Sequence, residues 1–354
     1  MRRIILSSLF ALFLFLQMGC QTVIVSSKRL EGMAGVNIIR REGSNYWAKD
    51  VFSDYTDSDN VNEYTGQQGP FRIKYHPSYN VNRWMVVEGT LGKENKYPII
   101  LDTGASVSLF VNDIHIIENK LTIYPQSRSN NDSVGWGICH VPELHIGQLT
   151  LVNCPCHYRE QHTELQLLGI PFNKGKAIIA GLAALRRFKY IAFDSINKEV
   201  ELSANEVFKP RQSDLWTQYP FSIEEDLGGN VYLIVKIPVA GKEVELQLDT
   251  GSGRGLAISQ SLWEQIHTEI QHVRLRKGKD LYPYIGLLSC QKGVIPELEV
   301  GNRTVRNAKI SVFPNDSPIV EQYSGMLGMQ YFEDTEIVLD FERDIMWLKN
   351  LPSR

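Results

Sequence analysis

Ile99-Ile100-Leu101-Asp102-Thr103-Gly104 and Leu246-Gln247-Leu248-Asp249-Thr250-Gly251 are two copies of one motif, an apolar run that ends in Asp-Thr-Gly. Each copy is followed by an apolar-apolar-Gly triplet, Ile179-Ala180-Gly181 or Met326-Leu327-Gly328. The spacing is 79 residues in both halves, from Asp102 to Gly181 and from Asp249 to Gly328. A single Asp-Thr-Gly is also an ordinary β-turn sequence, because Asp and Gly both favour turns. Two copies at matched spacing instead indicate a duplicated unit that presents one carboxylate from each half.

Other segments recur in the same order, so the duplication extends well beyond the motif. Pro142-Glu143-Leu144-His145-Ile146-Gly147 matches Pro296-Glu297-Leu298-Glu299-Val300-Gly301, and Tyr190-Ile191-Ala192-Phe193-Asp194 matches Glu336-Ile337-Val338-Leu339-Asp340. About 130 residues are therefore duplicated, and the insertions between matching segments differ between the halves.

The local patterns predict strands, because Val- and Ile-rich runs of four to eight residues are bounded by Gly, Pro, Asn or Asp. Short helices are expected only at 182–188 and 261–267. We therefore expect a mainly β, bilobal fold of two repeat-related β-barrel lobes with a central cleft. The expected organisation is a signal peptide (1–19), an N-terminal tether (20–69), a first lobe (70–205) and a second lobe (206–354).

The N-terminus has the pattern of an export signal. Arg2 and Arg3 precede a short apolar run, residues 4–18, which ends at Gly19-Cys20 as in a bacterial lipoprotein. We expect Cys20 to carry a lipid anchor, with plain secretion or an uncleaved anchor as alternatives. The expected location is the cell envelope, on either the periplasmic or the cell-surface face.

Composition sets broad limits on function. The 354 residues carry a net charge of −3, with 43% hydrophobic and 22% charged residues, which is ordinary for a globular protein. This charge gives no reason to expect a nucleic-acid partner. Because the duplication lies within one chain, we expect a monomer with an internal pseudo-two-fold axis.

Four cysteines remain beyond Cys20. A hairpin turning at Gly147 places Cys139 roughly opposite Cys156, so a disulfide between them is one interpretation, with Cys154 as a competitor for the bridge. Small buried strand residues are another interpretation. A metal site formed by Cys139, His140, Cys154, Cys156 and His157 is disfavoured, because Cys-Pro-Cys-His is not a standard zinc spacing. The pattern does not decide the pairing of these three cysteines or of Cys290.

Two adjacent carboxylates cannot both ionise cheaply, so the pair shares one proton over a wide pH range. The ionised Asp takes a proton from water, which attacks a carbonyl, while the protonated Asp donates to the carbonyl oxygen. This chemistry needs no metal and no organic cofactor. The Gly of each motif permits a tight loop, and the Thr hydroxyl can donate to the opposite loop.

With these motifs the chain resembles the aspartic proteases of the pepsin and retropepsin superfamily. It is most similar to bacterial retropepsin-like aspartyl proteases, with two units in one polypeptide, over about residues 70–350. The resemblance implies Asp102 and Asp249 as the catalytic dyad, supported by Thr103, Gly104, Thr250, Gly251 and Ser252. It also implies that the late apolar-apolar-Gly packs beside the catalytic loop.

The family covers its cleft with a flexible Gly-containing hairpin. The matching residues here are Gly135, Trp136 and Gly137 in the first half, and Ile285, Gly286 and Leu287 in the second. Trp136 either presses on substrate or packs on its own lobe, and the sequence does not decide between these roles. A flap tyrosine like that of pepsin-type enzymes is not placed by the sequence.

The two loops differ in the residue after Asp-Thr-Gly, which is Ala105 in the first and Ser252 in the second. A hydroxyl bonded to a carboxylate lowers its pKa. We therefore expect Asp249 to be the ionised member of the dyad and Asp102 the protonated one.

The leading interpretation is an endopeptidase that binds an extended peptide or protein substrate by strand-like hydrogen bonds. The alternatives are a catalytically silent peptide binder and a scaffold lipoprotein of the same fold, because fold does not fix function. Neither motif lacks its Asp, which favours the enzyme. No Gly-x-Ser-x-Gly, His-Glu-x-x-His or phosphate loop points to another reaction.

Overall fold

The computed structural model describes residues 20–26, 30, 33, 35–38, 63–66, 69–92, 95–125, 135–167, 170–226, 230–270, 273–282, 286–320 and 323–350. The predicted signal peptide, most of the predicted tether and Ile285 lie outside these ranges. Cys20 opens strand β1, and its lipidation stays a prediction. Among the described helices, none has both the length and the apolar character needed to cross a bilayer.

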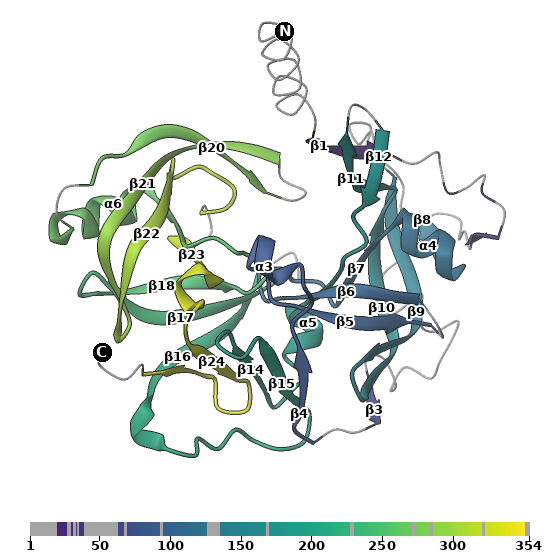
Figure 1. The fold of residues 1–354 in the computed structure, drawn as a ribbon, viewed down its shortest axis with the longest axis horizontal. Helices are drawn as coiled ribbons and strands as arrows, with labels where there is room; N and C mark the ends of the chain where they lie inside the picture. The colour runs from purple at the N-terminus through teal and green to yellow at the C-terminus, as the bar shows by residue number, and fades with distance from the viewer. Residues whose placement is uncertain are drawn as a thin grey trace, which may run out of the picture.

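The fold is mainly β and bilobal, as expected (Figure 1). The first lobe lies on the right of Figure 1 in blue and teal, and the second lies on the left in green. The strands of the first half are β1 (Cys20–Ser26), β2 (Asn37–Ile38), β3 (Glu63–Gly66), β4 (Phe71–Lys74), β5 (Val86–Leu91), β6 (Asn95–Asp102), β7 (Leu109–Asn112), β8 (Thr122–Pro125), β9 (Trp136–Ile146), β10 (Leu149–Arg159), β11 (Gln161–Leu167), β12 (Ile170–Lys174), β13 (Ile178–Gly181), β14 (Tyr190–Asp194) and β15 (Glu199–Ser203).

The second half repeats the order of the strands around its motif. Its strands are β16 (Trp216–Glu225), β17 (Val231–Val239), β18 (Lys242–Asp249), β19 (Leu256–Ser259), β20 (Arg276–Tyr282), β21 (Gly286–Val300), β22 (Arg303–Phe313), β23 (Gly325–Gly328), β24 (Glu336–Asp340) and β25 (Ile345–Lys349). The hairpins β9–β10 and β21–β22 turn at Gly147 and Gly301, and both glycines have φ +61°. That left-handed conformation favours Gly, so the expected Gly turns are confirmed.

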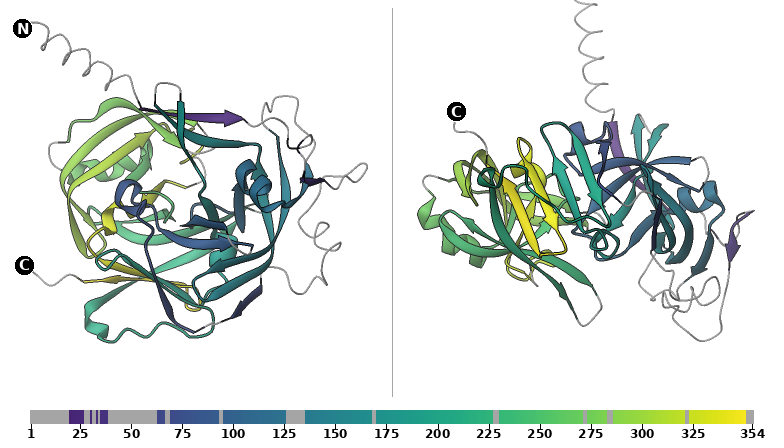
Figure 2. Two further views of the ribbon diagram at one scale, coloured as in Figure 1. Left: turned by 45° about the vertical axis from the view of Figure 1, so that its right-hand side comes forward. Right: turned by 90° about the horizontal axis from the view of Figure 1, so that it is seen from below.

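A central sheet joins the two lobes, and Figure 2 shows its strands between them. It is one end of a 13-stranded sheet: the strands β16-β25-β24-β14-β15-β4 continue from those of the second lobe, so both halves contribute. The repeat-related strands β14 and β24 pair antiparallel with each other, with Tyr190 opposite Asp340 and Asp194 opposite Glu336. Equivalent strands of the two halves therefore meet across the internal pseudo-two-fold axis.

Helices are short. The two expected ones are confirmed as α5 (Leu182–Leu185) and α6 (Gln260–Ile266), each slightly displaced or shorter than predicted. The sequence interpretation missed α4 (Asp113–Asn119), because its Asn112 cap and N3 residue His115 do not match the usual Ser/Thr-x-x-Glu/Gln pattern. The other helical segments are α3 (Tyr79–Asn82) and the 3₁₀ turns η3 (Ser213–Leu215), η4 (His267–Glu269) and η5 (Met329–Phe332).

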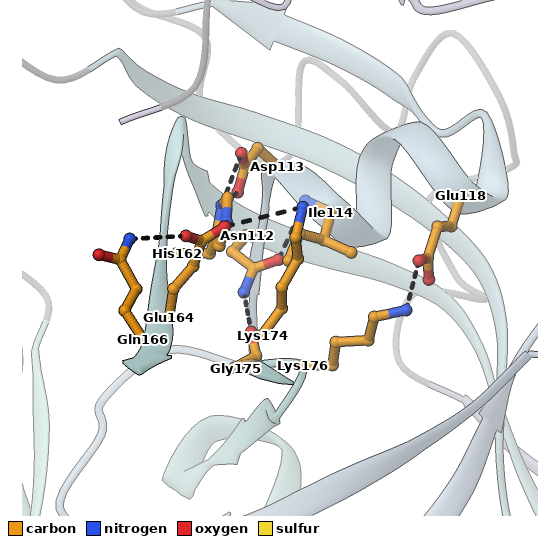
Figure 3. Close-up of polar contacts among 10 residues, drawn as sticks. All are labelled: Asn112, Asp113, Ile114, Glu118, His162, Glu164, Gln166, Lys174, Gly175 and Lys176. Carbon is orange, nitrogen blue, oxygen red and sulfur yellow. Dashed lines mark hydrogen bonds and ion pairs between the residues drawn. The ribbon is translucent and has the colours of Figure 1, made fainter. Parts of the chain in front are cut away.

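A buried polar network lies at the start of α4, beside β11 (Figure 3). His162 lies between two carboxyl groups, with Nδ1 3.1 Å from both Asp113 oxygens and Nε2 3.1 Å from Glu164 Oε1. Lys174 Nζ is 3.7 Å from Glu164 Oε1. The helix start and the strand bring these carboxyl groups together in a buried place. The ring of His162 between them gives each carboxyl group a hydrogen-bond partner.

Candidate active site

Both aspartates end a strand at the junction of the lobes. Asp102 is the last residue of β6 and Asp249 the last of β18. The late apolar-apolar-Gly segments, β13 and β23, run parallel beside these strands, with Gly181 opposite Asp102 and Gly328 opposite Asp249. The expected packing of this triplet beside each aspartate motif is therefore confirmed in both halves.

The late glycines are required by close backbone approach. A Cβ on Gly181 would lie 2.1 Å from the carbonyl oxygen of Val107. A Cβ on Gly328 would lie 2.4 Å from that of Arg254. In each half the backbone that leaves the Asp-Thr-Gly loop crosses directly over the glycine, so any side chain there would push the loop outward.

The two threonines lock the loops together by a reciprocal set of hydrogen bonds. Thr103 Oγ1 donates to Leu248 O at 2.6 Å and accepts from Thr250 N at 3.1 Å. Thr250 Oγ1 donates to Leu101 O at 2.6 Å and accepts from Thr103 N at 3.0 Å. Both threonines are fully buried. The hydroxyl contacts expected from the sequence are present on both sides.

The motif glycines let each carboxyl group pack against the opposite loop. A Cβ on Gly104 would lie 2.6 Å from Asp249 Cγ, and one on Gly251 would lie 2.3 Å from Asp102 Cγ. The carboxyl groups of Asp102 and Asp249 are hydrogen-bonded to each other. Chain positions 147 residues apart thus form one paired-carboxyl site.

The environments of the two carboxyl groups separate their proton affinities. Burial raises the pKa of Asp102, but hydrogen bonds from Asp249 and from backbone N–H groups oppose the rise, including Gly104 N at 2.9 Å from Oδ1. Burial also raises the pKa of Asp249, and the charge of Asp102 raises it well above its ordinary value. The two carboxyl groups therefore act as a coupled pair that shares one proton.

The Ser252 side chain, which was expected to lower the pKa of Asp249, has another partner. The Ser252 hydroxyl accepts from Arg254 N at 3.3 Å, and only the Ser252 backbone N–H serves the Asp249 carboxyl. Among the described residues no hydrogen bond joins the Ser252 hydroxyl to the Asp249 carboxyl, so the stated reason for an ionised Asp249 is absent. The sequence shows which residue carries a hydroxyl, whereas the loop conformation decides what that hydroxyl meets.

The expected flap residues lie where the second strand of a hairpin begins. Trp136 opens β9, which pairs with β8, and its indole is 37% exposed. Gly135 has no room for a side chain, since a Cβ there would lie 2.2 Å from Glu160 Oε2. In the second half Gly286 opens β21, which pairs with β20, and Leu287 is 60% exposed. Their contact with substrate stays a prediction.

The sequence interpretation missed a polar group that follows the second loop. Arg254 forms an ion pair with Asp280 at 2.7 Å, and its guanidinium lies 4.6 Å from the ring centroid of Tyr282. Asp280 also binds Lys292 Nζ at 2.6 Å and Ser311 Oγ at 2.6 Å. The Gly-rich run around Arg254 was the only signal of this polar group in the sequence. The partner residues lie on three other strands, so spacing along the chain does not show that they meet Arg254.

Cys139, Cys154, Cys156 and Cys290 are free and buried. Cys139 is the direct cross-strand partner of Cys156, as the hairpin predicted, but the two are thiols in this structure and form no bridge. Burial raises the pKa of the Cys154 and Cys156 thiols well above the ordinary value. Within the described ranges, no three His, Cys, Asp or Glu side chains are grouped to hold a metal ion.

Comparison with known proteins places the second Asp-Thr-Gly motif within an aspartyl protease family model. The family model for aspartyl proteases matches residues 235–331, from β17 through the second Asp-Thr-Gly loop to the residues after Gly328. The resemblance to the pepsin- and retropepsin-like aspartic proteases is therefore confirmed, and the sequence match itself lies in the second lobe. No curated protein matches the chain.

Solved structures of similar type include the aspartic proteinase from Irpex lacteus, with 11% identity and a TM-score of 0.45. The comparison covers 80% of this chain and 97% of the proteinase. Basic 7S globulin from soybean also matches, with 11% identity, a TM-score of 0.39 and the same two coverages.

Proposed function

We propose that this protein is an aspartic endopeptidase that hydrolyses peptide bonds with a water activated by Asp102 and Asp249. The observation that supports it most directly is the hydrogen-bonded carboxyl pair, fixed by the four threonine hydrogen bonds between the loops. Pre-positioned groups of this kind need no rearrangement during reaction, which is the main source of electrostatic catalysis.

The unequal proton affinities give each residue a role. Ionised Asp102 removes a proton from the attacking water, and protonated Asp249 donates to the carbonyl oxygen as the tetrahedral intermediate forms. Asp249 Oδ1 is buried and has no hydrogen-bond partner among the described residues. A polar atom in that state is suited to contact with a water or substrate oxygen.

The test is cleavage of a mixed peptide library between pH 3 and 8 by the parent protein and by its Asp102→Asn and Asp249→Asn variants. We expect internal cleavage by the parent and a loss of at least a thousandfold in both variants, because a paired-carboxyl mechanism needs both groups. Asp316→Asn, an exposed carboxyl change in the same lobe, is the matched control and should retain full activity.

The alternative is a catalytically silent peptide binder with the same fold. It gains support if the folded parent cleaves nothing across this pH range, both as purified and after proteolytic trimming of the tether. Equal activity in the parent and both dyad variants would instead show a contaminating protease and would remove the support for the proposed mechanism.

A further inference from the structure

We propose that a basic pocket beside the second catalytic loop is a subsite for an acidic group of the peptide substrate. The proposal rests on the endopeptidase function above and names a substrate class for it. The pocket has a volume of about 700 Å³, within the usual range for ligand sites. Its lining includes Gly253 to Ala257, a segment that begins four residues after Asp249.

The charge of this pocket is strongly one-sided. Six basic side chains line it, and Asp280 is the one acidic residue among its lining residues. The basic residues are Arg254, Arg274, Arg276, Lys277, Lys292 and Lys309. The whole chain carries a net charge of −3, so this concentration of positive charge is local. Clustered charge of one sign in a concave site raises the local concentration of oppositely charged groups.

Asp280 divides the basic residues into two sets. It holds Arg254 at 2.7 Å and Lys292 at 2.6 Å, which fixes these two side chains in the wall. Burial acts to raise the pKa of Asp280, but Lys292, Ser311 and Arg254 lower it overall, so Asp280 stays ionised. Its single negative charge offsets only part of the positive charge around it.

The remaining four basic side chains are available to a ligand. Arg274, Arg276, Lys277 and Lys309 are exposed, and none forms an ion pair with another residue that the structure describes. They come from β20, from the residues just before it and from β22, so they face the pocket from two strands. Arg and Lys side chains in this arrangement suit a carboxylate, which can accept charge-assisted hydrogen bonds from several donors.

The position of the pocket relates it to a bound peptide. Four residues of chain span at most about 14 Å, so the wall at Gly253 lies within that distance of Asp249. A peptide bound as a strand advances about 3.3 Å per residue. An Asp or Glu up to about four residues from the scissile bond is therefore in range of the pocket wall at Gly253.

The experiment uses a cleaved library peptide resynthesised with Glu, Gln or Lys at each of the four positions on either side of the scissile bond. At one or two positions we expect kcat/KM to be about tenfold higher for Glu than for Gln, mainly through KM. The Glu preference should shrink as salt rises from 20 to 300 mM, because the basic side chains are exposed.

Charge reversal supplies the specific variant. In Arg276→Glu/Lys309→Glu, we expect the preference at those positions to invert, so that the Lys peptide is cleaved faster than the Glu peptide. Lys209→Glu, an exposed change outside the pocket, is the matched control and should keep the parent preference. A Glu-to-Gln ratio below twofold at every position, or an unchanged ratio in the double variant, overturns the subsite while the endopeptidase proposal stands.

A binding measurement separates the two proposals. The Asp249→Asn variant is titrated calorimetrically with the Glu, Gln and Lys peptides, in which the scissile bond is replaced by a reduced, non-cleavable bond. If the parent cleaves no library peptide, and no scissile bond is therefore known, library peptides with Glu, Gln or Lys substitutions are titrated instead. Tighter binding of the Glu peptide without any cleavage by the parent supports the pocket and rejects the endopeptidase. Equal binding of the three peptides rejects the pocket whatever the activity.

Discussion

Thr103 and Thr250 each satisfy one buried donor and one buried acceptor of the opposite loop, and this reciprocity is what holds two distant carboxyl groups in one place. A hydroxyl is suited to this role because it both donates and accepts. Leaving a buried backbone group without its partner costs more than the net value of the hydrogen bond itself. The loops therefore stay in register only while both hydroxyls are present.

Replacing Thr103 tests this directly. Thr103→Val keeps the shape of the side chain but leaves Leu248 O and Thr250 N unpaired, so we expect unfolding to become easier by about 2–4 kcal/mol. The measurement is denaturant unfolding monitored by circular dichroism. Thr103→Ser keeps the hydroxyl and should lose less than about 1 kcal/mol. Equal losses in the two variants would show that packing of the methyl group, not hydrogen bonding, holds the loop.

At the scale of the element, α4 shows how a helix start can contain a titrating group. Asn112 accepts from Ile114 N, and its own backbone N–H donates to His115 Nδ1 at 3.1 Å. His115 Nε2 therefore carries the proton and donates to Lys176 O at 3.2 Å. Burial lowers the pKa of His115 to about 4, so the capping hydrogen bond depends on a neutral ring.

This arrangement makes the first lobe sensitive to acid. The pKa of His115 is lower in the folded state than in the unfolded state. The contribution of the neutral ring to the free energy of unfolding is therefore complete above pH 6.5 and is lost as pH falls toward about 4. The loss amounts to about 3 kcal/mol. His115→Gln keeps an N3 side chain that can accept the same hydrogen bond without titrating. We expect its melting temperature to fall less than that of the parent between pH 6.5 and 4.

Scanning calorimetry at half-unit pH steps checks this expectation, with His145→Gln as the control at a half-exposed histidine on β9. Parallel curves for the parent and His115→Gln would contradict the assigned role of His115.

At the scale of the whole molecule, the two lobes are joined by the central sheet and by the dyad loops. The pairing of β14 with β24 places equivalent strands across one axis, and the threonine hydrogen bonds cross the same junction. The site is therefore a product of lobe association, and its electrostatic energy is part of the stability of the junction. Two carboxyl groups with raised pKa values make that junction dependent on pH.

The sign of this dependence is opposite to that of His115. A carboxyl whose pKa is raised on folding contributes stability below its unfolded pKa, near 3.8, and that stability is lost as pH rises through the folded value. Asp249→Asn replaces the carboxyl group with a neutral amide, so no buried negative charge forms at this position as pH rises. We expect its melting temperature to exceed that of the parent by a margin that widens from pH 4 to pH 8.

The margin should reach a few degrees, since about 1 kcal/mol corresponds to about 2–4 °C in a domain of about 150–250 residues. Differential scanning calorimetry of both proteins in one buffer series checks it. Asp316→Asn controls for the loss of one exposed negative charge and should follow the parent. A constant margin across the series would mean that the dyad does not titrate in this range.

The sequence by itself determined the duplicated strands, the Gly turns at Gly147 and Gly301, and which two aspartates end equivalent strands of the two halves. These features are local: strand periodicity, turn conformation and motif spacing depend on neighbours along the chain. The sequence also predicted that Cys139 would face Cys156, because a hairpin turn fixes cross-strand register. The lipid anchor at Cys20 and the envelope location remain predictions from the sequence alone.

The tertiary structure decided that the carboxyl groups of Asp102 and Asp249 meet, what the Ser252 hydroxyl contacts, and that basic residues of separate segments line one pocket whose lining begins four residues after Asp249. It also decided that β14 pairs with its own repeat. Burial and charge interactions act through space and depend on separations of a few ångströms. Residues far apart in the chain set those separations, so strand patterns and motif spacing leave them open.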